Sequence, residues 1–115
     1  MLKPDVSRKD RVRAAQDEAA RQTPQLVGSR LRLLRQYLKF QGSEFHTQAD
    51  LAELAGIQQS TLSNYEKGKE DVMLPVDVAL VLCVAFATET MLKLEWLYRG
   101  DDSDIKKSFR DWLNG

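Results

Sequence analysis

The sequence has 115 residues, of which 43% are apolar and 30% are charged. This composition is typical of a folded chain that buries one modest core, and it excludes a disordered protein. The single histidine and the single cysteine exclude a histidine-rich metal site, a zinc-binding cysteine pair and an internal disulfide, so we expect no metal and no cofactor.

Charge is unevenly distributed, although the 17 basic and 17 acidic side chains balance. Residues 1–69 carry 12 basic against 8 acidic side chains, a net of +4, and residues 70–115 carry 5 against 9, a net of −4. A basic front and an acidic back allow one face to approach a polyanion such as DNA. Chance clustering of solvated charges is the alternative.

No segment predicts secretion or membrane insertion. The most apolar run covers residues 76–87 and contains Asp77, whereas a membrane-spanning helix needs about 20 apolar residues. The first ten residues contain no apolar signal segment. We therefore expect a cytoplasmic protein.

The chain predicts five or six helices and no strand. Residues 5–22 are rich in helix formers, with Asp5 or Ser7 as N-cap, but they offer little to bury. We expect this arm to be marginally stable and mobile, and Pro24 to end it. Residues 27–41 predict an amphipathic helix, ended by Gly42, whose apolar positions are Val27, Leu31, Leu34 and Leu38.

Two short helices follow. Thr47, with Asp50 three residues later, resembles a capping box that opens a helix ending at Gly56. A second helix covers residues 59–67 and ends at Gly68.

Three further helices are predicted beyond the loop 69–74. Pro75 precedes a helix over residues 76–88, and another covers 91–98 and ends at Gly100. A short tail helix is expected over 105–113, with one apolar stripe made of Ile105, Phe109, Trp112 and Leu113.

The segment 47–68, TQADLAELAGIQQSTLSNYEKG, has the residue types that a helix-turn-helix restricts. Two helices that cross closely need a small residue at the contact, here Ala52, and a turn residue that tolerates positive φ, here Gly56. Ile57 fills the turn, and Leu62 and Tyr65 point the second helix inward.

The remaining positions of the second helix are short, polar and uncharged: Gln58, Gln59, Ser60, Thr61, Ser63 and Asn64. Gln and Asn amides can pair with both N6 and N7 of adenine, which suits reading of base edges. Surface helices are more often a mixture of Glu and Lys. A merely solvated face is the alternative for any one of these residues, but the agreement of all restricted positions favours a DNA-binding helix.

These features resemble the lambda-repressor-like (Cro/XRE) helix-turn-helix family. The resemblance covers residues 27–100 and rests on VGSRLRLLRQ, TQADLAELAG, QQSTLSNYEKGK and LEWLYRG. It implies an all-α, five-helix DNA-binding domain, here with an N-terminal helical arm (1–26) and a C-terminal tail (101–115) that contains the short tail helix. It further implies a dimeric regulator, most simply a repressor in a bacterial or phage setting, whose second motif helix enters the major groove of double-stranded DNA.

The resemblance also implies residue roles. Gln59, Ser60 and Asn64 would read bases, with Gln58 and Ser63 as lesser candidates. Phosphate contacts would come from the start of the first motif helix and from the end of the second, at Thr47, Gln48, Lys67 and Lys69. Arg35 and Glu66 would form an ion pair that joins the first helix of the domain to the recognition helix.

This sequence departs from the family pattern in three places. The connection KFQGSEFH is long, and we interpret His46 as a loop residue rather than a site. The loop after the recognition helix carries Glu70 and Asp71 where basic residues are common. Residues 1–26 have no counterpart in the family's core fold.

The helix after Pro75 is apolar nearly all round, which is more than a small core can cover. We expect a homodimer through helices 76–98, with help from Met91, Leu92, Leu94 and Tyr98. Cover by the N- or C-terminal helix of the same chain is the alternative.

A second functional hypothesis is a protein-binding module, such as an antitoxin whose arm neutralises a partner protein. An enzyme is not expected, because no catalytic set of residues is visible.

Overall fold

The computed structural model describes residues 7–115, and every regular element in that range is helical. The expected all-α class is thus confirmed. Asp5, one of the two predicted N-cap residues of the arm, lies outside the described residues. The elements are α1 (Arg8–Arg21), α2 (Pro24–Phe40), α3 (Gln48–Ala55), α4 (Gln59–Lys67), the 3₁₀ turn η1 (Lys69–Asp71), α5 (Val76–Ala85), α6 (Ala87–Thr90), α7 (Leu94–Arg99) and α8 (Lys107–Asn114).

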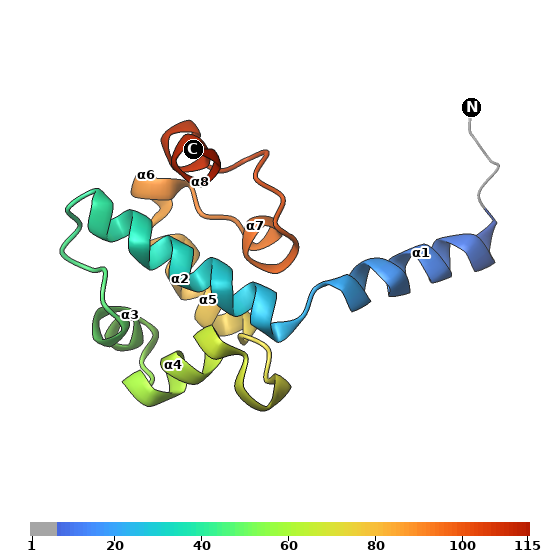
Figure 1. Cartoon of the computed structure of the whole chain (residues 1–115), viewed down its shortest axis with the longest axis horizontal. Coiled ribbons are helices and arrows are strands. Elements are labelled where there is room, and N and C mark those ends of the chain that lie inside the picture. Colours follow the sequence, from blue (N-terminus) through green and yellow to red (C-terminus); the bar gives the residue numbers. More distant parts are fainter. Residues whose placement is uncertain (1–6) are drawn as a thin grey trace.

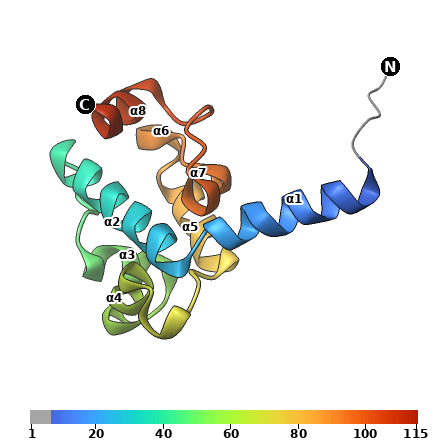
Figure 2. The same cartoon turned by 45° about the vertical axis from the view of Figure 1, so that its right-hand side comes forward.

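Helix α1 projects from the body of the molecule, as the two views in Figures 1 and 2 show. The Ser7 hydroxyl caps it by accepting from the Asp10 N–H at 3.1 Å. None of its residues is buried. The predicted helical arm is therefore present, and it covers none of the domain's apolar surface.

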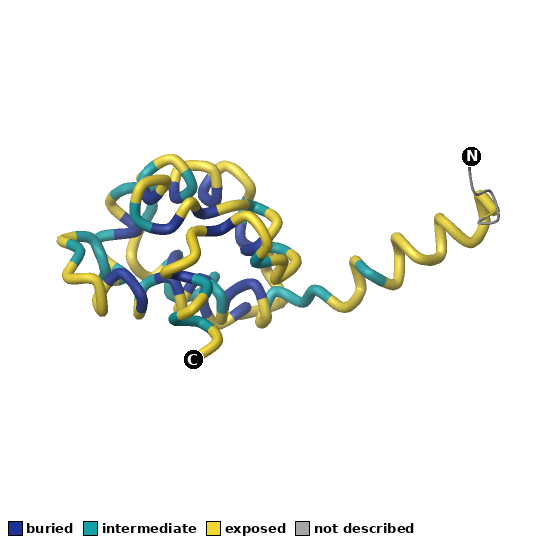
Figure 3. The backbone as a smooth tube through the Cα atoms, turned by 90° about the horizontal axis from the view of Figure 1, so that it is seen from above, coloured by how far each residue is buried: buried dark blue, intermediate teal, exposed yellow. Residues whose placement is uncertain are grey.

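Helix α2 is the centre of the fold and begins at Pro24, three residues earlier than predicted. The Thr23 side chain caps it by accepting from the Leu26 N–H at 3.2 Å. Pro24 therefore does more than end α1: it opens α2 at the position where its missing N–H costs least. The four predicted apolar positions of α2 are all fully buried. Figure 3 shows that buried residues lie in the body of the molecule and not in the projecting N-terminal helix.

The predicted helix 76–88 is wrong in its last turn. Helix α5 ends at Ala85, because Phe86 (φ −112°) leaves the helical conformation, and α6 is a separate single turn. The predicted helix 91–98 also begins too early. Met91 takes a left-handed conformation (φ 50°) and α7 starts at Leu94.

The tail helix packs on the body through aromatic side chains. The ring of Phe109 lies 4.7 Å from that of Tyr37 on α2 and 5.0 Å from that of Trp96 on α7. The Tyr37 hydroxyl also contacts the Ser108 hydroxyl at 3.1 Å. Helix α8 thus closes the end of the core formed by α2 and α7, and it begins two residues later than predicted.

In the part of the chain that the structure describes, no helix is long and apolar enough to span a membrane.

Candidate nucleic-acid interface

The turn between α3 and α4 is held by backbone geometry. Gly56 is left-handed (φ 69°, ψ 32°) and ends α3. The Ile57 N–H donates to the Ala52 carbonyl at 3.0 Å, and the Gly56 N–H donates to the Glu53 carbonyl at 3.2 Å. This pair of bonds is a Schellman motif, which satisfies the free carbonyls at the helix end. Ala52 is buried at the helix contact, so the predicted positions play the structural parts expected of them.

The start of α3 is a full capping box. The Thr47 hydroxyl accepts from the Asp50 N–H, and the Asp50 carboxylate accepts from the N–H groups of Thr47 and His46, all at 3.1 Å. Hydrogen bonds from Thr47, followed by the one from His46, hold the pKa of Asp50 below its usual range. The helix entry is therefore fixed, and the Thr47 hydroxyl already accepts one internal hydrogen bond.

Helix α4 turns a polar surface outward. Gln58, Gln59 and Ser60 are exposed at its start, and Ser63 and Asn64 are half-buried one turn later. Within residues 7–115 these five side chains make no hydrogen bond to the protein, and their amide and hydroxyl groups are available to an external partner. The inward side consists of Leu62 and Glu66, which are buried, and of Tyr65, which is half-buried.

A buried carboxylate joins α4 to α2 and α3. The Glu66 side chain is fully buried, and Arg35 forms the expected ion pair with both of its oxygens, one contact being 2.7 Å from Nη2 to Oε1. The Gln48 amide donates to Glu66 Oε1 at 3.0 Å, and Arg32 Nε lies 4.0 Å from the same oxygen. A buried charge needs such partners because leaving it unpaired is costly. Gln48 was predicted to contact a phosphate, and its side-chain amide is a donor in this internal network.

Sequence reasoning missed the close contact between α2 and α4. A Cβ added at Gly28 would lie 2.3 Å from the carbonyl oxygen of Glu66 and 2.4 Å from that of Tyr65. The two helix backbones therefore touch at this glycine. The available signal was a glycine beside Val27 on the buried side of an amphipathic helix.

The end of α4 is fixed by Gln25, which was also missed. Its amide donates to the Gly68 carbonyl at 3.0 Å and to the Asp71 carboxylate at 3.1 Å.

Lys67 and Lys69, the predicted phosphate contacts, are exposed on either side of Gly68. The acidic loop folds into η1, and Glu70 and Asp71 both take φ of 57°.

Residues 26–94, which extend from α2 to the start of α7, match a family model described as a helix-turn-helix domain. The chain matches no curated protein and no solved structure.

Proposed function

This chain belongs to the helix-turn-helix domain family, and we propose that it is a sequence-specific transcriptional repressor that acts as a dimer. In this proposal α4 enters the major groove, Gln59, Ser60 and Asn64 contact base edges, and Gln58 and Ser63 assist them. The protein is cytoplasmic, requires no cofactor and catalyses no reaction.

The observation that carries the proposal is the contrast between the two sides of α4. Its inner side is fixed by the buried Glu66 and by the backbone contact at Gly28. Its outer side carries short polar groups with no internal partner among the described residues. A rigid helix with unsatisfied amide and hydroxyl groups suits base reading, because discrimination requires donors and acceptors at fixed positions.

Selection of bound sequences from random DNA, followed by affinity measurements, tests the proposal. Asn64→Ala should cost about 1–3 kcal/mol on the selected site and leave binding to random DNA nearly unchanged. Asn114→Ala, on α8, is the matched control and should change neither affinity. Equal losses for Asn64→Ala on both DNAs would contradict base reading.

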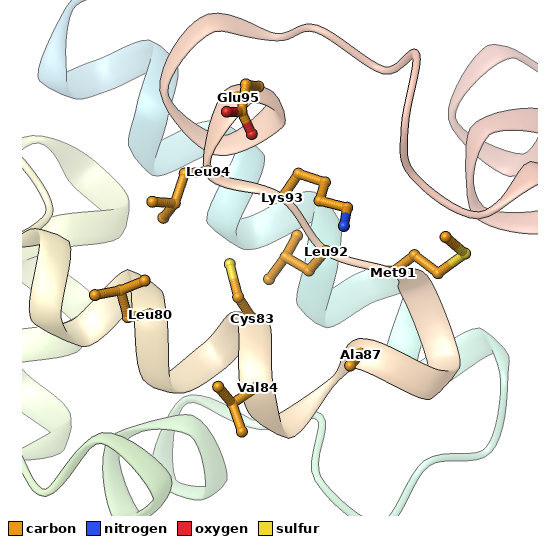
Figure 4. Close-up of a pocket in the computed structure, with 9 residues that line it drawn as sticks. All are labelled: Leu80, Cys83, Val84, Ala87, Met91, Leu92, Lys93, Leu94 and Glu95. Carbon is orange, nitrogen blue, oxygen red and sulfur yellow. The ribbon is translucent and has the colours of Figure 1, made fainter.

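A groove supports the proposed dimer, and no residue of α4 lines it. It has a volume of about 640 Å³. Figure 4 shows its lining, which comes from α5, α6 and the segment 91–95. Cys83, which is half-buried and packs against the core, also lines this groove. The adjacent surface of α5 exposes Leu80, Val81 and Val84. Neither α1 nor α8 covers this surface, so a second copy of the chain is its proposed cover.

The expected interface needs one correction. Leu92, predicted to help the dimer, is only 3% exposed and belongs to the core, whereas Met91 is 47% exposed. Tyr98 was also predicted to help the dimer, but its hydroxyl donates within the chain, to the Leu74 carbonyl at 2.6 Å. Burial raises the pKa of Tyr98 to about 12.

Sedimentation at micromolar concentration should show a dimer, and Val81→Lys should dissociate it, because an interface cannot bury an unpaired charge cheaply. Val12→Lys is the control, since Val12 is a similarly exposed valine on α1. A wild-type chain that stays monomeric would contradict this part of the proposal.

The second candidate function, binding of a partner protein, is favoured by α1, which projects and buries nothing. Co-purification of a stoichiometric protein with the full chain, lost on removal of residues 1–21, would support it.

A further inference from the structure

The groove that supports the proposed dimer borders a second hollow on α5. The second hollow has a volume of about 370 Å³ and is lined by Leu80, Val81, Val84 and Ala85, all of them apolar. Leu80 and Val84 line the groove as well as the hollow. They lie four residues apart and therefore on the same face of α5. The apolar surface is thus continuous across α5, from the groove to the second hollow.

This apolar surface is open in the single chain. Val84 is 79% exposed and Leu80 is 48% exposed. Met91, which also lines the groove, is 47% exposed. Large apolar side chains that gather in one exposed patch are typical of an interaction surface, because each of them gains by leaving water.

Two opposite charges border the apolar surface. Lys93 and Glu95 are exposed and line the groove on the side opposite Leu80 and Val84 (Figure 4). Within residues 7–115 they are the only charged side chains that line the groove or the second hollow. Neither forms an ion pair with another residue of that range. One cation and one anion at this edge are therefore available to a partner.

Both charges act on the same part of the groove. Burial raises the pKa of the Cys83 thiol, Lys93 lowers it and Glu95 raises it. Cys83 lines the groove. The two charges consequently lie close enough to one point of the lining to influence it in opposite directions.

We propose that Lys93 and Glu95 form two reciprocal ion pairs with Glu95 and Lys93 of a second copy of this chain, and that these pairs select the second copy as the occupant of the groove. The inference rests on the dimer of the proposed function. In a two-fold interface, a contact between residue i and residue j of the second copy is always repeated between j and i. A cation beside an anion therefore matches its own rotated copy.

A two-fold axis that runs across α5 and passes between Lys93 and Glu95 gives this pairing. The same axis, passing between Leu80 and Val84, sets Leu80 of each copy against Val84 of the other. The interface then has apolar contacts on α5 and ion pairs at its edge, which is the usual arrangement of a protein interface.

The edge charges also discriminate against other partners. An identical copy supplies an anion opposite Lys93 and a cation opposite Glu95 by symmetry alone. A different apolar surface lacks this arrangement, and one with the charges in the wrong order sets like charges against each other. The chemistry of the groove edge therefore favours self-association over binding of an unrelated protein.

Reversal of either charge should weaken the dimer. Lys93→Glu sets two carboxylates against each other at both symmetric contacts, and Glu95→Lys does the same with two ammonium groups. Each variant should raise the dimer Kd by about tenfold or more, measured by sedimentation equilibrium without DNA.

An equal mixture of Lys93→Glu and Glu95→Lys should recover a dimer, with a Kd within about threefold of wild type. In the mixed dimer, every edge charge again faces its opposite. The double variant Lys93→Glu/Glu95→Lys should recover a homodimer for the same reason. Recovery in the mixture would also show that both single variants are folded.

Lys39→Glu and Glu53→Lys are the matched controls. Both residues are exposed, on α2 and α3, and neither lines the groove. They change the net charge of the chain by the same amounts as the groove variants. Their dimers should keep the wild-type Kd within about twofold, alone and mixed, because screened charges outside the interface act weakly.

The reciprocal pairing is refuted if Lys93→Glu and Glu95→Lys each dimerise as wild type does, or if their mixture dimerises no better than either variant alone. The proposed dimer would survive either result, provided that Val81→Lys still dissociates it. A wild-type chain that is monomeric at every accessible concentration would overturn both.

Discussion

Local sequence favours α1 over α4 as a stable helix, whereas in the structure α4 is the helix held by tertiary contacts. Helix α1 has 14 residues, many of them strong helix formers, with a side-chain cap and an internal Glu18–Arg21 ion pair at 2.7 Å. Helix α4 has nine residues, QSTLSNYEK, and no side-chain cap. Local preference favours α1. Yet α1 buries nothing, whereas α4 is fixed by a buried ion pair, a backbone contact and Gln25.

Tertiary contacts, rather than local helix preference, hold α4 in its place in this fold. Short isolated helices are marginal in water, so α4 depends on tertiary contacts for both its existence and its orientation. Because tertiary contacts stabilise α4, its outer residues need not be strong helix formers and can be residues that suit a ligand. Helix α1 has the reverse character, because its sequence supports a helix but gives it no fixed place on the domain.

Removing the buried carboxylate of Glu66 should have the largest effect on stability, because it removes the ion pair that holds α4. Glu66→Ala leaves Arg35, which is only 20% exposed, without its partner. We expect a loss of about 3–5 kcal/mol in the free energy of unfolding, measured by denaturant titration. Glu53→Ala, an exposed glutamate of α3, is the control and should stay within about 0.5 kcal/mol. A loss for Glu66→Ala as small as that of Glu53→Ala would show that the ion pair does not hold α4.

Separating the backbones of α2 and α4 should have the next largest effect. Gly28→Ala places a methyl group 2.3 Å from the Glu66 carbonyl oxygen, so the helices must move apart. Overpacking of this kind costs about 1–3 kcal/mol, even though alanine is the better helix former. The displacement should also lower affinity for the selected DNA site more than for random DNA, because α4 itself moves.

Ser29→Ala is the matched control for Gly28→Ala, because Ser29 is the exposed neighbour on the same helix. It should leave both stability and sequence preference nearly unchanged. A stabilised Gly28→Ala protein would mean that helix propensity outweighs the contact.

The sequence predicted the elements whose ends are set by local chemistry. Gly56 and Gly68 ended their helices as expected, and Thr47 with Asp50 capped α3. The break after Ala85 was missed because Phe86 and Met91 are neither glycine nor proline, and tertiary packing imposes their conformations. Gly28 and Gln25 were missed for a related reason. Their partners are about 40 residues away, at Glu66 and Gly68, and periodicity within one helix cannot show such a contact.

Removal of α1 should have the smallest effect on stability. It is also the clearest test of whether the domain depends on α1. Deleting residues 1–21 removes six basic and four acidic side chains but no buried residue among those described. Gln22 is retained because its side-chain oxygen accepts from Arg30 at 3.1 Å. The free energy of unfolding should therefore change by less than about 0.5 kcal/mol.

DNA binding by this truncated chain should weaken equally on selected and random sequences. The arm carries a net charge of +2 and offers only electrostatic contact with the DNA backbone. Each phosphate neutralised contributes about 0.9 to the salt dependence of log K, so the slope should fall by about one or two units while sequence preference is kept. A domain that unfolds on truncation, or a dimer that dissociates, would show that α1 is structural. In that case the independence of α1 inferred from its lack of buried residues would be wrong.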